Sequence, residues 1–447
     1  MSKVLLFFAL ALLPSFATAQ TLPLTLDAAL SYAFEHREEV RSKRKQQELA
    51  RLRVDEKRAA FLPQLNLAST LQRNKNYDNF SGFTIEGEIN QVPIQVAIER
   101  DTPRYQQNTS IILSYDLYDS GTSRWQLSEA EATARAAEAS TREQMRNIAL
   151  ELGETYTAVA KLQIEQIGAQ RALDLASENE KISHTSHLRG QTAYIGWQSA
   201  LLARDEKAAA LKEVGHRLEE AWLRYKRALG APDSLHAGAR GELAMSFDVA
   251  TLKSLAPLGA LPPQLDKLRY EAQASAARGR AGDAAEAAKV ELFAQYAFVG
   301  RDASRLAGAL GDTQRDYAAV GLKLSVDLFD AGKRPRRAQR LLENEIAQLE
   351  LARQTRLSAS THEESLRQLR QTEIRAEIAG ERERLAQKKM EIEHLRWRKG
   401  EASALHYREA SEARGQAADQ LRVAELERAL AAFKLALSPH AELPASE

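Results

Sequence analysis

The stretch LSYDLYDSG at residues 113–121 returns as LSVDLFDAG at residues 324–332. Six of the nine positions are identical, and the sixth position stays aromatic. A second match joins LEEAWLRYKRAL (218–229) to LERALAAFKLAL (426–437) at nearly the same separation. Two matches with nearly equal separations indicate a duplicated unit of about 210 residues.

Each copy of the repeated stretch is predicted to be the end of a strand followed by a turn into a helix. The turn residues expected from this repeat are Asp116, Asp119 and Gly121 in the first copy and Asp327, Asp330 and Gly332 in the second.

Short segments with alternating hydrophobic residues lead into both turns. Val320, Leu322, Leu324, Val326 and Leu328 alternate with glycine and polar residues, a period of two that is typical of a membrane strand with one lipid face and one wet face. The first copy has the same register, because residue 113 maps onto residue 324. The expected strands are therefore about 64–72, 108–118, 290–300 and 315–329, joined by loops over 73–106 and 301–315.

Long helical stretches follow each pair of strands. Residues 122–183 contain no proline and two glycines, and residues 336–395 contain no proline and one glycine. At 1.5 Å per residue each would span about 90 Å, more than the width of an ordinary domain, so we predict coiled-coil rods. Shorter helical stretches are expected over 24–60, 197–229 and 403–436.

The N-terminus has the pattern of an export signal. Lys3 precedes an apolar run from Val4 to Leu13, and Ala17-Thr18-Ala19 is a small-x-small cleavage site. Residues 1–19 are expected to be removed, which leaves Gln20 and not a lipid-carrying cysteine at the new terminus. The alternative is an uncleaved anchor helix, which would need an apolar run of about 20 residues.

The remaining boundaries follow from these elements. The first repeat is expected over 20–229, with a helical hairpin at about 121–229, and the second over 264–437, with a hairpin at about 332–436. A connector rich in proline and glycine at 230–263 joins them, and the tail 438–447 is expected to be disordered.

Composition and motifs argue against several classes of protein. The chain has no cysteine, so disulfides and thiolate metal sites are excluded. Its 62 basic and 61 acidic residues nearly balance, which gives no sign of a nucleic-acid partner. A nucleotide-binding loop, a nucleophile elbow and an HExxH zinc motif are all missing from the sequence. We therefore predict no catalytic residue, no cofactor and no metal.

The predicted strands require partners from other chains. Four strands cannot close a barrel, and open sheet edges are not tolerated in lipid. Three chains would supply twelve strands, enough for a barrel wider than the filled eight-stranded ones. The predicted fold class is mainly α with membrane β: a trimeric 12-stranded β-barrel, four strands from each chain, continued by a periplasmic α-helical barrel.

The chain resembles the TolC-like outer membrane efflux protein family across essentially its whole mature length. The motifs behind this resemblance are LTLDAALSYA at 24–33, AFLPQLNL at 60–67, the paired turns and the two RALG-like helix ends. The resemblance implies a homotrimer in the cell outer membrane that extends into the periplasm. It also implies a passive exit channel for efflux or type I secretion, surrounded by outer-membrane lipid. The channel would open at its helical tips when a periplasmic adaptor protein and an inner-membrane pump or ABC exporter dock.

The resemblance locates candidate gate residues at the two tips. The family's pattern of an aromatic residue, a glycine and then acidic residues meets LRWRKGEASALHYREA at 395–410, with Trp397 and Gly400 in the first two places. This chain has His406 and Glu409 where the family commonly has two aspartates.

In the first repeat Gly190 matches the tip glycine, and Gly196 stands where an acidic residue is common. The tips are instead basic, with Arg189, Arg396, Arg398, Lys399 and Arg408. Such tips could favour anionic cargo or an acidic adaptor surface. The alternative is that they are solvated residues near helix C-termini, where cations are favoured.

Four histidines also lie near the tips: His184, His187, His394 and His406. They could form a proton-sensitive latch or a metal site. Because no acidic or thiolate ligand pattern accompanies them, the sequence favours ordinary polar tip residues.

Two other classes of protein remain as alternatives. A soluble periplasmic coiled-coil or adaptor-like protein would explain the rods and the export signal, but not four amphipathic strands placed identically in two repeats. A secreted enzyme with added helices would need a carboxylate pair or triad outside the rods, and the connector offers no such spacing.

Overall fold

The computed structural model describes residues 25–73, 75, 83–89, 92–98, 104–231, 255, 262–302, 305–312 and 316–438. The predicted signal peptide, most of the predicted connector and nearly all of the predicted tail lie outside the described residues. The chain divides into two compact units. The helical unit comprises Met1–Gln47, Ala137–Leu268 and Leu351–Glu447, and the strand unit comprises Glu48–Ala136 and Arg269–Glu350. Each unit takes residues from both repeats, so the division by repeat stays a prediction.

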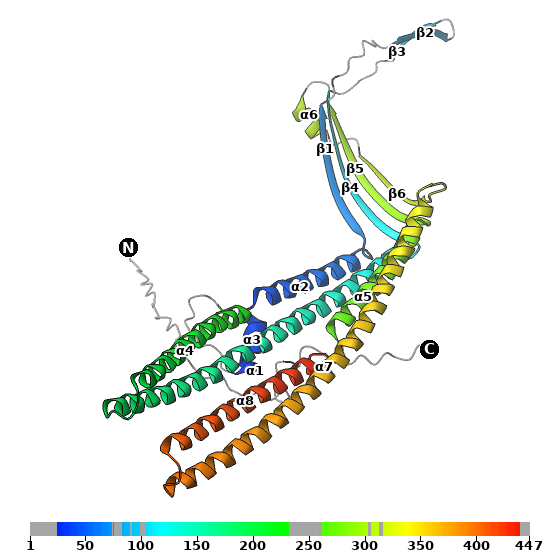
Figure 1. The fold of residues 1–447 in the computed structure, drawn as a ribbon. Coiled ribbons are helices and arrows are strands. Elements are labelled where there is room, and N and C mark those ends of the chain that lie inside the picture. Colours follow the sequence, from blue (N-terminus) through cyan, green and yellow to red (C-terminus); the bar gives the residue numbers. More distant parts are fainter. Residues whose placement is uncertain are drawn as a thin grey trace, which may run out of the picture. The chain divides into compact units, whose positions relative to one another are not determined.

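The two predicted rods are confirmed as α3 (Thr122–Leu188) and α7 (Lys333–Arg398). Each rod turns back into a shorter helix, α4 (Tyr194–Leu229) after α3 and α8 (Ala404–Ala436) after α7 (Figure 1). The remaining helices of the described residues are α1 (Leu26–His36), α2 (Glu38–Ala59), α5 (Pro263–Ala285) and α6 (Leu306–Gly311). None of the described helices combines the length and the apolar character needed to cross a membrane.

The helical stretch expected over 24–60 is interrupted at Arg37, which separates α1 from α2. Its ψ of 129° is extended, and its guanidinium donates to the Ala228 carbonyl at 3.0 Å and to Glu151 at 2.6 Å. The break therefore comes from contacts with residues far away in the sequence, which local helix propensity does not predict.

Four strands form one antiparallel sheet in the order β1-β4-β5-β6 (Figure 1). They are β1 (Gln64–Arg73), β4 (Tyr105–Tyr118), β5 (Lys289–Asp302) and β6 (Asp316–Ser325). Each corresponds to one of the four predicted strands: β4 and β6 to those predicted from alternation, and β1 and β5 to their expected partners. The strand expected to reach residue 329 ends at Ser325, because residues 326–330 already lead into the turn before α7.

The segment predicted as a loop over 73–106 contains two further strands. β2 (Phe83–Ile89) and β3 (Val92–Ile98) pair with each other as an antiparallel hairpin. β3 contains Pro93, which a two-stranded hairpin can hold because one side of each strand is unpaired. The loop expected over 301–315 likewise contains the short helix α6.

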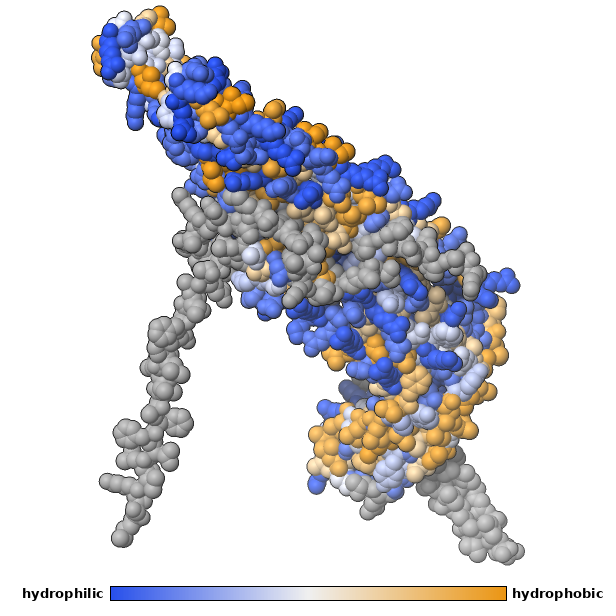
Figure 2. All heavy atoms as spheres, turned by 90° about the horizontal axis from the view of Figure 1, so that it is seen from below, coloured by the Kyte–Doolittle hydropathy of each residue, from blue (hydrophilic) through white to orange (hydrophobic). Residues whose placement is uncertain are grey.

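Strand register sorts the side chains of the four-stranded sheet onto two faces. One row of partners reads Leu67, Ile111, Tyr296 and Ala318, and the adjacent row on the other face reads Asn66, Ile112, Gln295 and Ala319. The first face is largely apolar, and the following residues on it are each at least 66% exposed: Leu65, Leu67, Val320, Leu322 and Leu324. Figure 2 shows a broad hydrophobic area over the strands. The predicted alternation is thus confirmed as one apolar and one mainly polar face.

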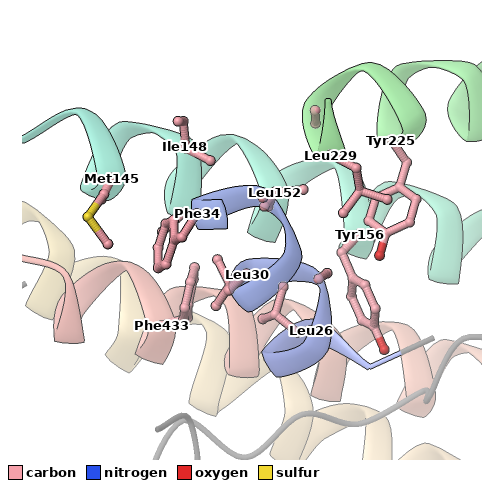
Figure 3. Close-up of a cluster of buried hydrophobic side chains, with 14 of the residues drawn as sticks. Leu26, Leu30, Phe34, Met145, Ile148, Leu152, Tyr156, Tyr225, Leu229 and Phe433 are labelled. Carbon is pink, nitrogen blue, oxygen red and sulfur yellow. The ribbon is translucent and has the colours of Figure 1, made fainter. Parts of the chain in front are cut away.

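The helical unit has its own core, built where α1 packs against α3, α4 and α8 (Figure 3). Leu26, Leu30 and Phe34 of α1 enter it together with Tyr225 and Phe433. Tyr225 and Phe433 occupy matching positions in the two similar stretches 218–229 and 426–437, and both side chains are fully buried. The duplicated aromatic residue therefore anchors the base of each helical hairpin.

Candidate functional site: the helical tips and the strand-to-helix turns

The two tips of the helical unit have the same backbone geometry. The Gly190 amide donates to the His187 carbonyl and the Gln191 amide to the Ser186 carbonyl, at 2.8 and 2.9 Å. The Gly400 amide and its successor make the same pair of bonds after α7, both at 2.9 Å. This arrangement is a Schellman motif, in which the glycine takes a left-handed conformation. The φ angles of Gly190 and Gly400 are +73° and +74°.

Gly190→Ala is expected to lower the free energy of unfolding by about 1 kcal/mol, since an L side chain is strained at positive φ. Sterics add nothing, because a Cβ on Gly190 would meet no atom within 4 Å. Gly215→Ala is the matched control: it lies inside α4, has equally open space, and should raise stability by up to about 1 kcal/mol through helix propensity. Urea unfolding measures both. Equal effects from the two substitutions would contradict the prediction.

The residues that follow each tip glycine differ between the repeats. Ser403 caps α8, because its hydroxyl accepts from the His406 amide at 3.2 Å, whereas Ala193 before α4 makes no side-chain cap. Gly196 is the counterpart of His406, and a Cβ there would lie 2.7 Å from Cγ2 of Thr192. The first tip therefore has little room for a side chain at Gly196, whereas the second tip exposes the side chain of His406 at the equivalent position.

The tip cations are partly neutralised. Arg396 pairs with Glu393 at 3.0 Å, and Arg408 pairs with Glu178 on α3. The other three basic residues of the tips are exposed and have no ion pair in the described part of the chain: Arg189, Arg398 and Lys399. Trp397 and Glu409 are also exposed. Both tips therefore present free positive charge at the ends of α3 and α7.

Each tip also carries a cluster of rings that the sequence analysis missed. At the first tip Trp197 lies 4.8 Å from His184 and 5.9 Å from His187, measured between ring centroids. The indole donates to Glu180 at 2.9 Å, and Nδ1 of His187 lies 3.0 Å from the Thr192 carbonyl oxygen. His184 and His187 therefore share a face of α3, and the rings of both lie against Trp197 of α4.

The second tip repeats this cluster with other rings. Tyr407 lies 5.5 Å from Trp397 in a stacked pair and 4.9 Å from His394. Each ring lies 210 residues after its counterpart at the first tip: Tyr407 corresponds to Trp197, Trp397 to His187, and His394 to His184. The shared offset is the signal that could have revealed the clusters. Across the described residues, no group of three or more histidines and carboxylates is placed to hold a metal ion.

Ion pairs on the facing sides of α3 and α8 link the two hairpins in the helical unit. Lys161 pairs with Glu427 and Lys434 with Glu154, both at 2.6 Å. Nearer the tips come the pairs Arg171–Asp419 and Arg408–Glu178. A movement of one hairpin against the other would have to break these contacts.

The strand unit carries the two strand-to-helix turns. Asp119 accepts from the Ser123 amide at 2.6 Å and from the Gly121 amide at 2.9 Å, so its carboxylate caps α3. Burial alone would raise the pKa of Asp119, but these hydrogen bonds outweigh it and the pKa is lowered. Gly121 has a φ of +87°, which favours glycine there.

The second turn uses the same residues with different neighbours. Asp330 accepts from the Gly332 amide at 2.7 Å and pairs with Arg336, and the hydrogen bonds from Arg336 and then Gly332 lower its pKa. Lys333 donates to the backbone oxygens of Glu286 and Asp327 at 3.0 and 3.2 Å. Asp116, placed by sequence in the first turn, is the last-but-two residue of β4 and pairs with Lys289 at 2.9 Å.

Asp119→Asn is expected to destabilise the protein by about 1 kcal/mol at pH 7, because the amide keeps only one of the two acceptor oxygens and loses the negative charge at the N-terminus of α3. Because the folded-state pKa of Asp119 is depressed, its contribution is present above the unfolded pKa of about 3.9 and is lost as pH falls through the folded pKa. The gap between wild type and variant should therefore shrink from pH 7 to pH 3 in urea unfolding. Glu409→Gln, at an exposed carboxylate without an ion pair in the described part of the chain, is the control. A gap that stays constant would contradict the prediction.

Comparison with known proteins supports a single class. Solved structures that share the fold include the CmeC outer membrane channel of Campylobacter jejuni, at 14% identity and a TM-score of 0.70, covering 94% of this chain and 87% of that one. The outer membrane protein VceC of Vibrio cholerae has 16% identity and a TM-score of 0.68, covering 92% and 96%. A membrane protein from Pseudomonas aeruginosa has 15% identity and a TM-score of 0.69, covering 92% and 93%. No curated protein matches the sequence.

The fold is therefore that of TolC-like outer-membrane channels: long helical hairpins joined to an antiparallel sheet with one apolar face. In sequence, residues 29–231 match the outer membrane efflux protein family, which confirms the resemblance carried by the repeated turns. The chain is accordingly similar to outer membrane efflux channel proteins, in sequence over residues 29–231 and in fold over nearly its whole length.

Proposed function

We propose that this chain is the outer-membrane exit channel of a tripartite efflux or type I secretion system. Three copies would form one passive conduit, opened at its helical tips by a periplasmic adaptor and an inner-membrane pump or ABC exporter. The observation behind this proposal is the four-stranded sheet: one of its faces is apolar and exposed, and among the described residues both its edges are open.

The open edges explain why several copies are needed. In the described part of the chain β1 and β6 each pair on one side only. Lipid offers no hydrogen-bond partner for a free strand edge, so β6 of one copy would pair with β1 of the next. Three copies give twelve strands in a closed barrel, with the polar face around Asn66 and Gln295 turned inward.

The tips support the gating part of the proposal. Each hairpin ends in a turn with a left-handed glycine and a ring cluster, and the hairpins are linked to each other by ion pairs such as Arg408–Glu178. Docking of a partner that competes for these charges would separate the hairpins. The exposed cations Arg189, Arg398 and Lys399 would favour an acidic surface on that partner.

The deciding measurement is the mass of the protein extracted by detergent from purified outer membranes, obtained by light scattering. A trimer that is absent from the soluble periplasm and conducts ions in a planar bilayer is the expected result. A monomer or dimer in the soluble fraction would contradict it and would favour the soluble periplasmic coiled-coil protein instead.

A further inference from the structure

The turn between β6 and α7 exposes two large apolar side chains. Leu328 is 94% exposed and Phe329 is 90% exposed. Their counterparts in the first repeat, Leu117 and Tyr118, are 51% and 58% exposed although β4 is flanked by strands on both sides. Exposure at this position is therefore not an effect of the sheet edge alone.

Register shows which face these residues continue. Tyr118 is the partner of Val290, and Val290 is the partner of Leu324, so all three lie on the apolar face of the sheet. Phe329 matches Tyr118 in the repeat and extends the same face beyond the last residue of β6. Aromatic side chains at such a border are typical of the membrane–water interface.

The charges around the two turns are opposite. Residues 326–340, here called the basic turn, contain five cations and two carboxylates. The equivalent residues 115–129 contain one cation and three carboxylates. The cations of the basic turn lie in the first turns of α7, which holds no acidic residue there. Positive charge at a helix N-terminus is unfavourable, so this arrangement needs anions nearby.

Carboxylates of the protein form ion pairs with only some of these cations. Arg336 pairs with Asp330 and Glu286, Arg340 pairs with Asp283 at 2.6 Å and with Glu286 at 3.1 Å, and Lys333 donates to two carbonyls. Arg334 and Arg337 are exposed and have no ion pair or side-chain hydrogen bond in the part of the chain that the structure describes. They are three residues apart, and so lie on one face of α7.

We propose that the basic turn binds anionic glycerophospholipid at the inner boundary of the outer membrane. Leu328 and Phe329 enter the acyl-chain border, and the guanidinium groups of Arg334 and Arg337 contact lipid phosphates. The apolar residues continue the lipid face of the sheet, and the charge complements the headgroup, which together define this occupant. The inference rests on the proposed function, because it requires the sheet to be in lipid.

The test uses Phe329→Trp as a reporter in the full-length protein, reconstituted in phosphatidylcholine bilayers. Because the chain has four tryptophans of its own, the signal is the difference from the same protein with Phe329. Quenching by brominated phosphatidylglycerol and by brominated phosphatidylcholine gives the relative affinity of the site for the two lipids. Anionic lipid should be preferred by about fivefold for each arginine that contacts it. Arg334→Gln/Arg337→Gln should bring the ratio close to one. Arg356→Gln/Arg370→Gln removes the same charge from two exposed, unpaired arginines of α7 in the described region and should leave the ratio unchanged.

Each other outcome has a distinct meaning. Quenching by both lipids with the same ratio in all three proteins would overturn the inference while the channel proposal stands. If inorganic phosphate alone abolished the preference for anionic lipid, the ligand of the basic turn would be a free anion and not a lipid. Dissociation of trimers in the basic-turn variant, with the lipid ratio retained, would assign the two arginines to a subunit contact. No quenching by either lipid would contradict the proposed function itself.

Discussion

Leu67→Arg is expected to prevent stable insertion of the channel in the outer membrane. Leu67 lies near the middle of β1 and is 72% exposed on the apolar face. An arginine on the lipid face of a membrane strand costs about 2–4 kcal/mol near the bilayer midplane, and a trimer would carry three of them. We expect trimers in purified outer membranes to fall at least tenfold, as measured by unheated gel electrophoresis.

Asn66→Arg is the matched control, because the neighbouring residue of the same strand belongs to the polar face. Its row of partners contains Gln295, and a charge there would face water in the barrel. This variant should insert like the wild type and alter only conductance. Loss of insertion in both variants would mean that the strand tolerates no charge at all, and loss in Asn66→Arg alone would mean that the faces have been assigned the wrong way round.

The sheet could be predicted from the sequence because the alternation of apolar residues and the duplication both indicate the same strands in the same register. Alternation from Val320 to Leu324 identifies a strand with two unlike faces, and the repeat transfers the register to residue 113. The structure joins the strands with Leu322 opposite Leu292 and Val320 opposite Ala294. Local patterns of this kind are strong because one residue of slip would move every apolar side chain to the other face.

The features that sequence reasoning missed depend on contacts between distant residues. The ring cluster around Trp197 needs α4 to return along α3, and the pair Lys161–Glu427 joins residues 266 positions apart. The break at Arg37 comes from bonds to Glu151 and Ala228. None of these leaves a periodic trace, so only the shared offset of the repeats could have pointed to the rings.

Phe433→Ala is expected to lower the free energy of unfolding of the helical unit by about 3–5 kcal/mol. The Phe433 ring is fully buried in the core formed by α1, α3, α4 and α8 (Figure 3). Removing a buried aromatic side chain loses its burial and leaves a cavity whose walls relax only in part. Urea unfolding followed by circular dichroism measures the loss. The aromatic residue at the matching position of the first repeat, Tyr225, is just as deeply buried, and Tyr225→Ala should cause a loss of similar size.

Gly153 shows how closely that ring is held. A Cβ on Gly153 would lie 2.7 Å from Cε1 of Phe433, so Gly153→Ala should destabilise by about 1–3 kcal/mol despite the better helix propensity of alanine. In a Phe433→Leu background the clash is removed, and the same substitution should become neutral or stabilising. Gly215→Ala should stabilise in both backgrounds, because nothing lies near that position. Since independent sites add within about 0.5 kcal/mol, additive effects of Gly153→Ala and Phe433→Leu would show that the two residues do not touch. A reversal of sign confined to Gly153 would establish that the absence of a side chain there is what lets α8 and its aromatic anchor approach α3.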